Sequence, residues 1–196
     1  MNRALFIIDV QNDFTEGGAL PVTGGHAVAE GITRYLGEHA ALYSGVFASR
    51  DWHSETGHNG GHFALTGDPD FVTTWPPHCI AGTSGAEYDP ALNTAHVTVE
   101  IRKGDGEPAY SIFEGHAGDG RQTGRILSDD GITDVDIVGI ATDFCVRASA
   151  MDALAHGQRV RVLTDLVAGV DQAGSEQALA ELARNGAELI TSGAVA

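Results

Sequence analysis

The sequence ALFIIDV at residues 4–10 decides the fold class, because five consecutive apolar residues lead directly into an aspartate. A short and nearly uninterrupted apolar run is typical of a strand that is buried on both faces of a sheet. Outward from this run, five further segments have strand character. We expect these strands at residues 45–50, 96–102, 135–141, 159–165 and 187–191.

Segments with helical character lie between most of these strands. Apolar residues within residues 25–42 recur at the spacing of one helix face, and we expect three more helices at residues 120–131, 145–157 and 174–186. Strands that alternate with helices form a parallel sheet with helices on both faces. The sequence therefore predicts an α/β fold in which residues 1–196 form a single domain.

The composition excludes several classes of partner. The chain has 27 acidic and 11 basic residues, and its formal net charge is -16. A surface of this sign repels phosphates, so we expect no binding to nucleic acid or to an anionic membrane. The longest apolar runs are too short to span a bilayer, and the first residues lack the extended apolar region of a signal peptide. We therefore expect a cytoplasmic protein whose two cysteines form no disulfide.

Residues 51–95 interrupt the alternation of strands and helices. This segment is rich in glycine, proline, histidine and tryptophan, and it has no helical or strand period. A structureless stretch of this length within a compact domain is usually functional. It follows the carboxyl end of the second expected strand, and open α/β sheets bind their ligands at that edge.

Three polar residues lie at, or just beyond, the carboxyl ends of expected strands: Asp9, Lys103 and Cys145. Cys145 is at the expected start of a helix, where the positive end of the helix dipole favours a thiolate. A carboxylate can accept the thiol proton and an ammonium can stabilise the charge, which is the arrangement of an activated nucleophile. Each residue alone has an ordinary alternative, namely a core thiol, a turn aspartate and a solvated lysine. Their coincidence at one sheet edge favours a site.

Lys103 is the single lysine of the chain, since the other ten basic residues are arginine. A lysine presents a compact point charge, whereas an arginine presents a planar fork. The lone lysine therefore either occupies a place that a fork cannot fit, or is a chance result of a compositional bias.

A second group of candidate residues lies in the irregular segment. The motifs RDWHSETGHNGGHF and WPPHC contain Asp51, His53, His58, His62 and His78. Asp51 and His53 are two residues apart, so both point to the same side of an extended segment. Carboxylate and imidazole ligands suit zinc, iron or manganese, and we expect one such divalent ion. The alternative is a surface loop whose histidines only form hydrogen bonds.

Two aromatic residues are close in sequence to these candidates. Phe14 follows Asp9 by five residues, and Trp75 precedes His78 by three. Aromatic side chains near such a site suit the walls of a pocket for a flat ring, but aromatic residues are also common in an ordinary core.

Several motifs of the chain resemble those of the nicotinamidases, which are isochorismatase-like cysteine hydrolases. The motifs occur in the order IIDVQNDF, GGAL, PVTGG, DWH, WPPHC, GTSGAE and GIATDFCV. WPPHC and AYSIFEG are most similar to the bacterial nicotinamidase/pyrazinamidase branch. The resemblance extends from residue 4 to about residue 170. It implies a three-layer doubly wound fold with a six-stranded parallel sheet in the order 3-2-1-4-5-6.

The resemblance also implies roles for individual residues. It implies a catalytic triad of Asp9, Lys103 and Cys145, and an oxyanion hole formed by the backbone N–H groups of Ala141 and Cys145. It further implies a cis peptide bond between Ile140 and Ala141.

The metal ligands and substrate-binding residues are implied in the same way. The ligands are Asp51, His53 and His78, with His62 as the additional ligand. The segment between His53 and His62 is longer than in close relatives and adds His58, which is a rival to His62. The substrate-binding residues are Phe14, Leu20, Trp75 and Tyr110.

The implied activity is the hydrolysis of nicotinamide to nicotinate and ammonia, and of pyrazinamide in the same way. It proceeds through a cysteine thioester, with the metal orienting the ring nitrogen. One alternative is an amidase for another small amide, such as a carbamoyl or ureido compound. Another is a catalytically silent binding protein, which the complete triad disfavours. We expect a monomer or a small homo-oligomer.

Overall fold

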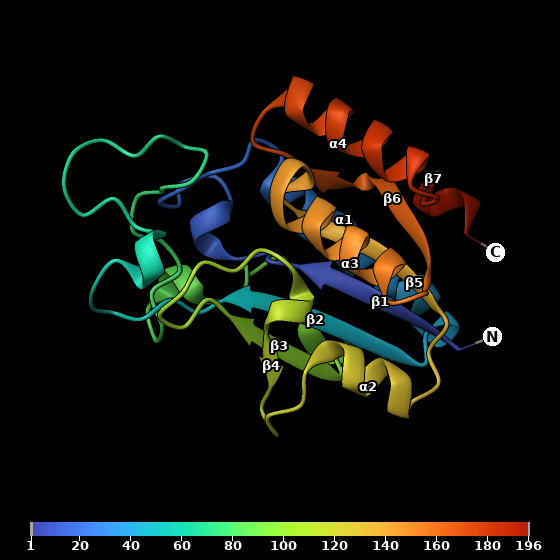
Figure 1. Cartoon of the computed structure of the whole chain (residues 1–196). Helices are drawn as coiled ribbons and strands as arrows, with labels where there is room; N and C mark the ends of the chain where they lie inside the picture. Colours follow the sequence, from blue (N-terminus) through green and yellow to red (C-terminus); the bar gives the residue numbers. More distant parts are fainter. Residues whose placement is uncertain (1, 196) are drawn as a thin grey trace.

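The structure, a computed structural model, describes residues 2–195, and its centre is a seven-stranded sheet in the order β4-β3-β2-β1-β5-β6-β7 (Figure 1). Six strands run parallel, and a two-residue strand, β4 (His116–Ala117), pairs antiparallel with β3 at one edge. The parallel strands are β1 (Arg3–Ile8), β2 (Gly45–Asp51), β3 (Val99–Lys103), β5 (Asp134–Ile140), β6 (Arg159–Ala168) and β7 (Glu188–Ile190).

The doubly wound α/β class is confirmed, but the expected strand count of six is wrong by one. If β4 is left out of the numbering, the six parallel strands have the implied order 3-2-1-4-5-6. β4 was not predicted, because two residues are too few to show the alternation of apolar and polar residues that is typical of a strand. In addition, neither His116 nor Ala117 belongs to an apolar run. Only the cross-strand partners Arg102 and Ile101 define it as a strand.

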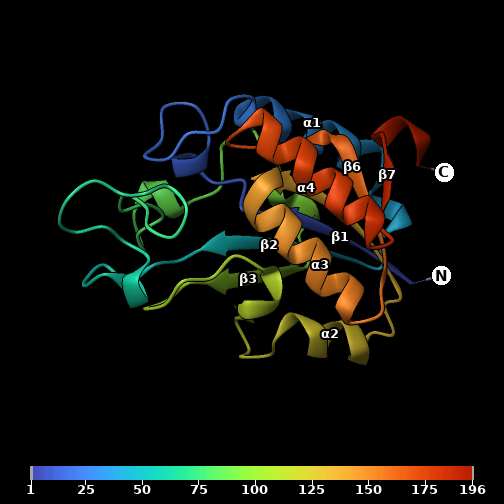
Figure 2. The same ribbon diagram turned by 45° about the horizontal axis from the view of Figure 1, so that its top comes forward.

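Within residues 2–195, four α-helices cover the two faces of the sheet (Figure 2). α1 (Gly25–His39) packs on one face, and α2 (Thr123–Asp129), α3 (Arg147–Ala155) and α4 (Gln172–Arg184) pack on the other. Side chains of β1 alternate between these two cores: Leu5 and Ile7 lie in the first, and Phe6 and Ile8 in the second. The nearly continuous apolar run that predicts β1 is therefore the run of a strand with a core on each side. No helix of the described residues has the length and apolarity that crossing a bilayer requires.

The boundaries of several elements differ from the expected ones by a few residues. The expected strand 96–102 begins only at Val99, because Thr94–His96 form a 3-10 helix whose N-cap, Asn93, accepts a hydrogen bond from the Ala95 N–H. The expected helix 174–186 begins two residues earlier, because Asp171 caps α4 by accepting from the Gly174 N–H at 2.7 Å.

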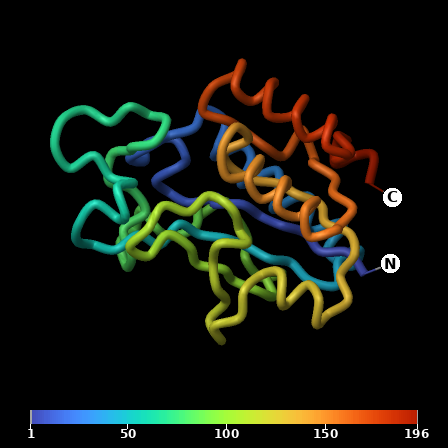
Figure 3. Tube along the Cα trace, in the orientation of Figure 1, coloured from blue at the N-terminus to red at the C-terminus, as the bar shows by residue number. Residues whose placement is uncertain are grey.

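The irregular segment 51–95 extends from the carboxyl end of β2, away from the helices. It is the cyan-to-green loop region at the left of Figure 1, and the tube in Figure 3 shows that it contains only short turns. The two ends of the chain lie at the opposite end of the sheet. The long segment therefore covers the edge at which the carboxyl ends of the parallel strands meet.

Candidate active site

The carboxyl edge of the sheet brings Asp9, Lys103 and Cys145 together. The Lys103 Nζ lies 2.8 Å from the Asp9 Oδ2 and 3.7 Å from the Cys145 Sγ. It also forms an ion pair with the Asp51 carboxylate at the end of β2. All four side chains are buried. The Lys103 ammonium therefore contacts two carboxylates and one thiol, and all of these groups are buried from water.

The local backbone explains why these side chains meet. β1 ends in a turn at Asp9, whose φ of 47° lies in the left-handed region that aspartate tolerates better than most residues. Asp51 and Lys103 are paired in register between β2 and β3, so their side chains leave the sheet side by side. Cys145 lies in a π-helical turn, Thr142–Val146, which joins β5 to α3. The peptide bond between Ile140 and Ala141 is cis, as the resemblance implies.

Burial controls the protonation of this cluster. It raises the pKa of Asp9 above its ordinary value, an effect that Lys103 opposes. Burial also raises the pKa of the Cys145 thiol well above its ordinary value, again against the attraction of Lys103. Burial alone would lower the pKa of Lys103, but the carboxylates of Asp51 and Asp9 outweigh it and raise that pKa. The cluster thus holds a charged lysine and a neutral thiol beside a carboxylate that accepts protons readily.

Cys145 lies in the first turn of the helical stretch that leads into α3, but burial of the sulfur opposes the thiolate that this position favours. Cys145 precedes the first residue of α3 by two positions, and burial of the sulfur dominates its pKa. A neutral thiol needs a base before it can act as a nucleophile, and the buried Asp9 carboxylate belongs to the same cluster.

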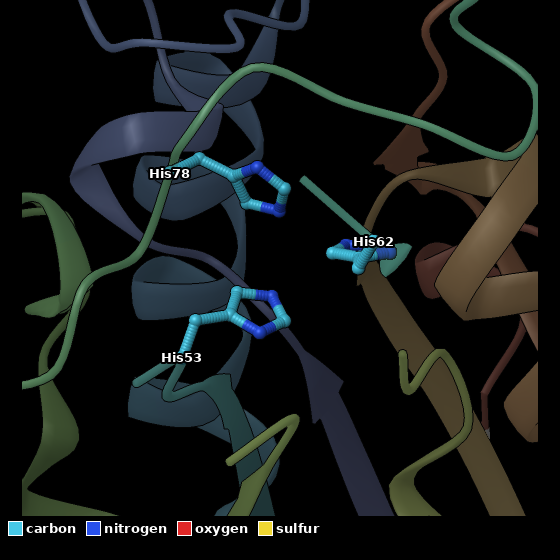
Figure 4. Close-up of side chains that lie close together, drawn as sticks. All are labelled: His53, His62 and His78. Atoms are coloured by element: carbon cyan, nitrogen blue, oxygen red, sulfur yellow. The ribbon is translucent and has the colours of Figure 1, made fainter. Parts of the chain in front are cut away.

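Three buried histidines of the segment 51–95 face one another in Figure 4: His53, His62 and His78. One ring nitrogen of each lies within 4.8 Å of the others. The Nδ1 atoms of His53 and His78 lie 2.7 Å from the carbonyl oxygens of Gly104 and Pro76, respectively. These carbonyls require the proton on Nδ1, so the Nε2 lone pairs remain free.

The donor set fits a divalent metal ion. His53 Nε2 and His62 Nδ1 are buried and have no hydrogen-bond partner, an arrangement that is unfavourable unless a further group binds them. The Asp51 Oδ2 lies 3.6 Å from His53 Nε2 and 3.7 Å from His78 Nε2, which adds an anionic donor. Burial and the neighbouring histidines lower the pKa of His62 to about 3, so its ring is neutral at pH 7. Neutral imidazoles with a carboxylate suit zinc, iron or manganese.

The structure separates the two rival histidines. His62 lies in the three-histidine group, whereas His58 is exposed and caps a 3-10 turn, Asn59–Gly61. The His58 Nδ1 accepts a hydrogen bond from the Gly61 N–H at 2.7 Å, so this nitrogen is already occupied. His62, and not His58, is therefore placed to complete the donor set.

A cavity adjoins both groups. The indole Nε1 of Trp75 donates a hydrogen bond to the Tyr110 hydroxyl at 3.1 Å, and the Phe14 ring lies 5.3 Å from the His78 ring. The cavity thus has aromatic walls between the thiol and the histidines. Its lining includes every substrate-binding residue that the resemblance implies, together with the thiol and two of the histidines: Phe14, Leu20, Trp75, Tyr110, Cys145, His62 and His78.

Two residues that shape the site were missed by the sequence reasoning. Phe144 lines the cavity and packs edge-on against Trp75 with the ring centres 5.0 Å apart. Its position next to Cys145 was the available signal. The hydroxyl of Ser49 donates to the Asp9 Oδ1 at 2.7 Å. Its signal was its position two residues before Asp51 in the second expected strand, because residues two apart share a face.

The fold and this geometry define an α/β protein with a buried cysteine–carboxylate–lysine cluster beside three histidines that can hold a metal ion. The chain belongs to the isochorismatase family, since the isochorismatase domain matches residues 3–194.

Relatives and solved structures extend the similarity over nearly the whole chain. The nicotinamidase/pyrazinamidase of Mycobacterium tuberculosis is 47% identical over 190 residues, which cover 97% of this chain and 99% of that protein. The structure of PnC1 from L. infantum in complex with nicotinate has a TM-score of 0.84 and 36% identity, covering 100% of this chain and 95% of that one. The structure of the pyrazinamidase of Pyrococcus horikoshii in complex with zinc has a TM-score of 0.81 and 36% identity. The match covers 97% of this chain and 99% of that one.

Proposed function

We propose that this chain is a metal-dependent nicotinamidase that hydrolyses nicotinamide to nicotinate and ammonia, and pyrazinamide in the same way. One observation carries the proposal: the Cys145 thiol, with Lys103 Nζ 3.7 Å away, opens into the same aromatic cavity as His62 and His78. The similarity to a nicotinamidase/pyrazinamidase, to a nicotinate complex and to a zinc complex supports the substrate and the ion.

The cavity suits a small, flat amide. Phe14, Trp75, Cys145, His62 and His78 all line the cavity. In the proposed binding mode the ring would lie between Phe14 and Trp75, with its carboxamide toward Cys145 and its ring nitrogen toward the histidines. A divalent ion held by Asp51, His53, His62 and His78 would supply a Lewis acid that orients the ring nitrogen. The Cys145 side chain is buried, and its low exposure to water strengthens the charge interactions around it.

Asp9 is the proposed base and acid. It accepts the proton of the Cys145 thiol while the sulfur bonds to the carboxamide carbon. The amide nitrogen then takes the proton from Asp9, the C–N bond breaks and ammonia leaves a thioester on Cys145. Asp9 next removes a proton from water, which attacks the thioester, releases nicotinate and restores the thiol. The raised pKa of Asp9 suits this exchange, because a more basic carboxylate takes a proton from sulfur more readily.

Lys103 and two backbone groups stabilise the charges of these steps. The ammonium of Lys103 stays protonated and compensates the negative charge that moves among Asp9, Asp51 and the sulfur. The backbone N–H groups of Ala141 and Cys145 bind the oxyanion of each tetrahedral intermediate. The loss of one such donor typically raises a barrier by about 3 kcal/mol.

A substrate panel tests the proposal. Ammonia release is measured for the purified protein loaded with zinc, iron or manganese, with nicotinamide, pyrazinamide, a carbamoyl compound and a ureido compound as separate substrates. We expect the highest kcat/KM with nicotinamide and a comparable value with pyrazinamide. A higher kcat/KM with the carbamoyl or ureido compound would replace the proposal with that amidase. Ammonia release from none of the four would indicate a silent binding protein.

A further inference from the structure

Gln11 is fully buried and lies three residues beyond the end of β1. Its Oε1 accepts a hydrogen bond from the Asp51 N–H at 2.8 Å. Its Nε2 donates to the carbonyl oxygens of Asp51 and Ala86, both at 2.9 Å. The amide therefore uses both of its donors and its acceptor on main-chain atoms.

The topology explains why Asp51 needs such a partner. β1 and β2 pair in register only as far as Ile7 and Ala48, because the chain turns away at Asp9. β2 continues to Asp51 and keeps β3 as its neighbour on the other side. The N–H and C=O of Asp51 on the β1 side would thus be buried without partners. The side-chain amide of Gln11 takes the place of a peptide unit of β1 and pairs both groups.

The Asp51 carboxylate connects the two halves of the site. One oxygen pairs with the Lys103 ammonium, and the other lies 3.6 Å from His53 Nε2 and 3.7 Å from His78 Nε2. A rotation of the Asp51 backbone would displace both contacts. It would also move His53, which follows two residues later on the same extended segment.

We infer that Gln11 is a positioning residue for the metal, which holds the Asp51 backbone so that one carboxylate oxygen faces the histidines while the other remains on Lys103. This inference rests on the metal site of the proposed function. Gln11 acts on that site only through the main chain of Asp51, since its side-chain hydrogen bonds all go to backbone atoms.

The test is the affinity of the purified, metal-free protein for Zn²⁺, measured by competition with a chromophoric chelator. Gln11→Met keeps the length of the side chain and removes all three hydrogen bonds. We expect its dissociation constant for Zn²⁺ to rise by about 10- to 100-fold, as is usual when a partner of a metal ligand is lost. Asn12→Ala is the matched control, because Asn12 donates to the Ser84 carbonyl of the same loop at 2.7 Å without bonding Asp51. We expect its Zn²⁺ affinity to equal that of the wild type.

Thermal unfolding of the metal-free variants separates positioning from stability. A lowered melting temperature in Gln11→Met with unchanged Zn²⁺ affinity would overturn the inference, because Gln11 would then only support the fold. Gln11→Glu serves if the methionine variant fails to fold. It keeps an acceptor for the Asp51 N–H but sets an oxygen against the carbonyls of Asp51 and Ala86, and we expect weaker Zn²⁺ binding here too.

Metal binding by the wild-type protein distinguishes a failure of the role of Gln11 from a failure of the proposed metal site. Wild-type protein that binds Zn²⁺, with Gln11 variants of equal affinity, would overturn the role of Gln11 alone. Wild-type protein that binds neither zinc nor iron nor manganese would overturn this inference together with the metal site of the proposed function.

Discussion

Two pairs of buried aspartates lie at opposite ends of the sheet, and their charges are balanced in different ways. At the amino ends of β1, β5 and β6, Arg159 binds Asp134 and Arg161 binds Asp136, each through two guanidinium nitrogens. Arg3 bridges the two carboxylates. Every carboxylate oxygen of this cluster accepts a hydrogen bond. The guanidinium groups of Arg159 and Arg161 each donate a pair of hydrogen bonds to one carboxylate, which is the strong bidentate geometry.

The carboxyl-edge cluster is balanced much less completely. Asp9 and Asp51 share the single ammonium of Lys103, and the unpartnered buried atoms of this region include the His53 Nε2 and the His62 Nδ1. A fully bonded cluster adds rigidity to the fold, whereas one with free lone pairs and a point charge can exchange protons and bind ligands. The chain uses arginine forks at the first edge and its single lysine at the second, in accord with these demands.

The largest expected effect comes from removing the thiol of the carboxyl-edge cluster. Cys145→Ala should lower kcat for ammonia release from nicotinamide by about 10⁴-fold or more, because the reaction loses its nucleophile. Cys79→Ala is the matched control, since Cys79 is the other buried thiol and we expect its variant to keep kcat. Steady-state ammonia assays of both variants provide the measurement. Substantial turnover by Cys145→Ala would rule out the thioester route.

Asp136→Ala removes one carboxylate from the amino-edge cluster. It should lower the free energy of unfolding by about 3–5 kcal/mol, because Arg3 and Arg161 are left in a buried region without their shared carboxylate. The folded fraction should keep the wild-type kcat, since this cluster lies at the far end of the sheet. Urea unfolding and ammonia release are measured on the same preparation. A large loss of kcat with unchanged stability would break the division between the two clusters.

Lys103→Arg exchanges a point charge for a fork in the reactive cluster. It should lower kcat by about 10²- to 10³-fold, because a planar fork cannot enter the same space between Asp9, Asp51 and Cys145. Arg102→Lys is the control, since Arg102 is the adjacent, exposed residue, and we expect near wild-type kcat from it. Steady-state kinetics with nicotinamide compare the two variants. A Lys103→Arg protein with near wild-type kcat would show that the site does not require a lysine. The single lysine would then be a chance result of a compositional bias.

The smallest expected effect is the acid response of Asp134. Hydrogen bonds from Arg159 lower the pKa of Asp134 from 3.8 to about 2 in the folded protein. A depressed pKa contributes stability that is present above the unfolded pKa and is lost as pH falls through the folded one. This contribution amounts to about 2 kcal/mol. Urea unfolding at pH 5 and pH 2 should show a smaller loss of stability in Asp134→Asn than in the wild type. Equal losses in the two proteins would contradict the pairing.

The parts of the fold that follow from local sequence are those with a long local pattern. The run before Asp9 predicts β1 because both faces of that strand are buried. β4 has no such signal, since only its pairing with β3 makes its two residues a strand. Strand ends also place Asp9, Lys103 and Cys145, because the carboxyl ends of parallel strands meet at one edge.

The rest of the site depends on contacts between residues that are distant in the chain. His62 and His58 have similar sequence surroundings, and burial distinguishes them: the His62 carbonyl accepts from the Trp75 N–H, while His58 remains exposed. Gln11 and Asp51 are 40 residues apart, so no local sequence pattern predicts the hydrogen bonds between them. The raised pKa of the Cys145 thiol follows from its burial, which its position before a helix does not reveal.

The most direct test of the central claim is ammonia release from nicotinamide by one purified preparation, assayed with its metal, after chelation and after the metal is returned. The reactive cluster and the histidine site should work together, so release should stop on chelation and recover when zinc, iron or manganese is added. No release from protein shown to hold a metal would contradict the proposed nicotinamidase activity. Release that persists after complete removal of the metal would contradict the role of the three histidines and Asp51.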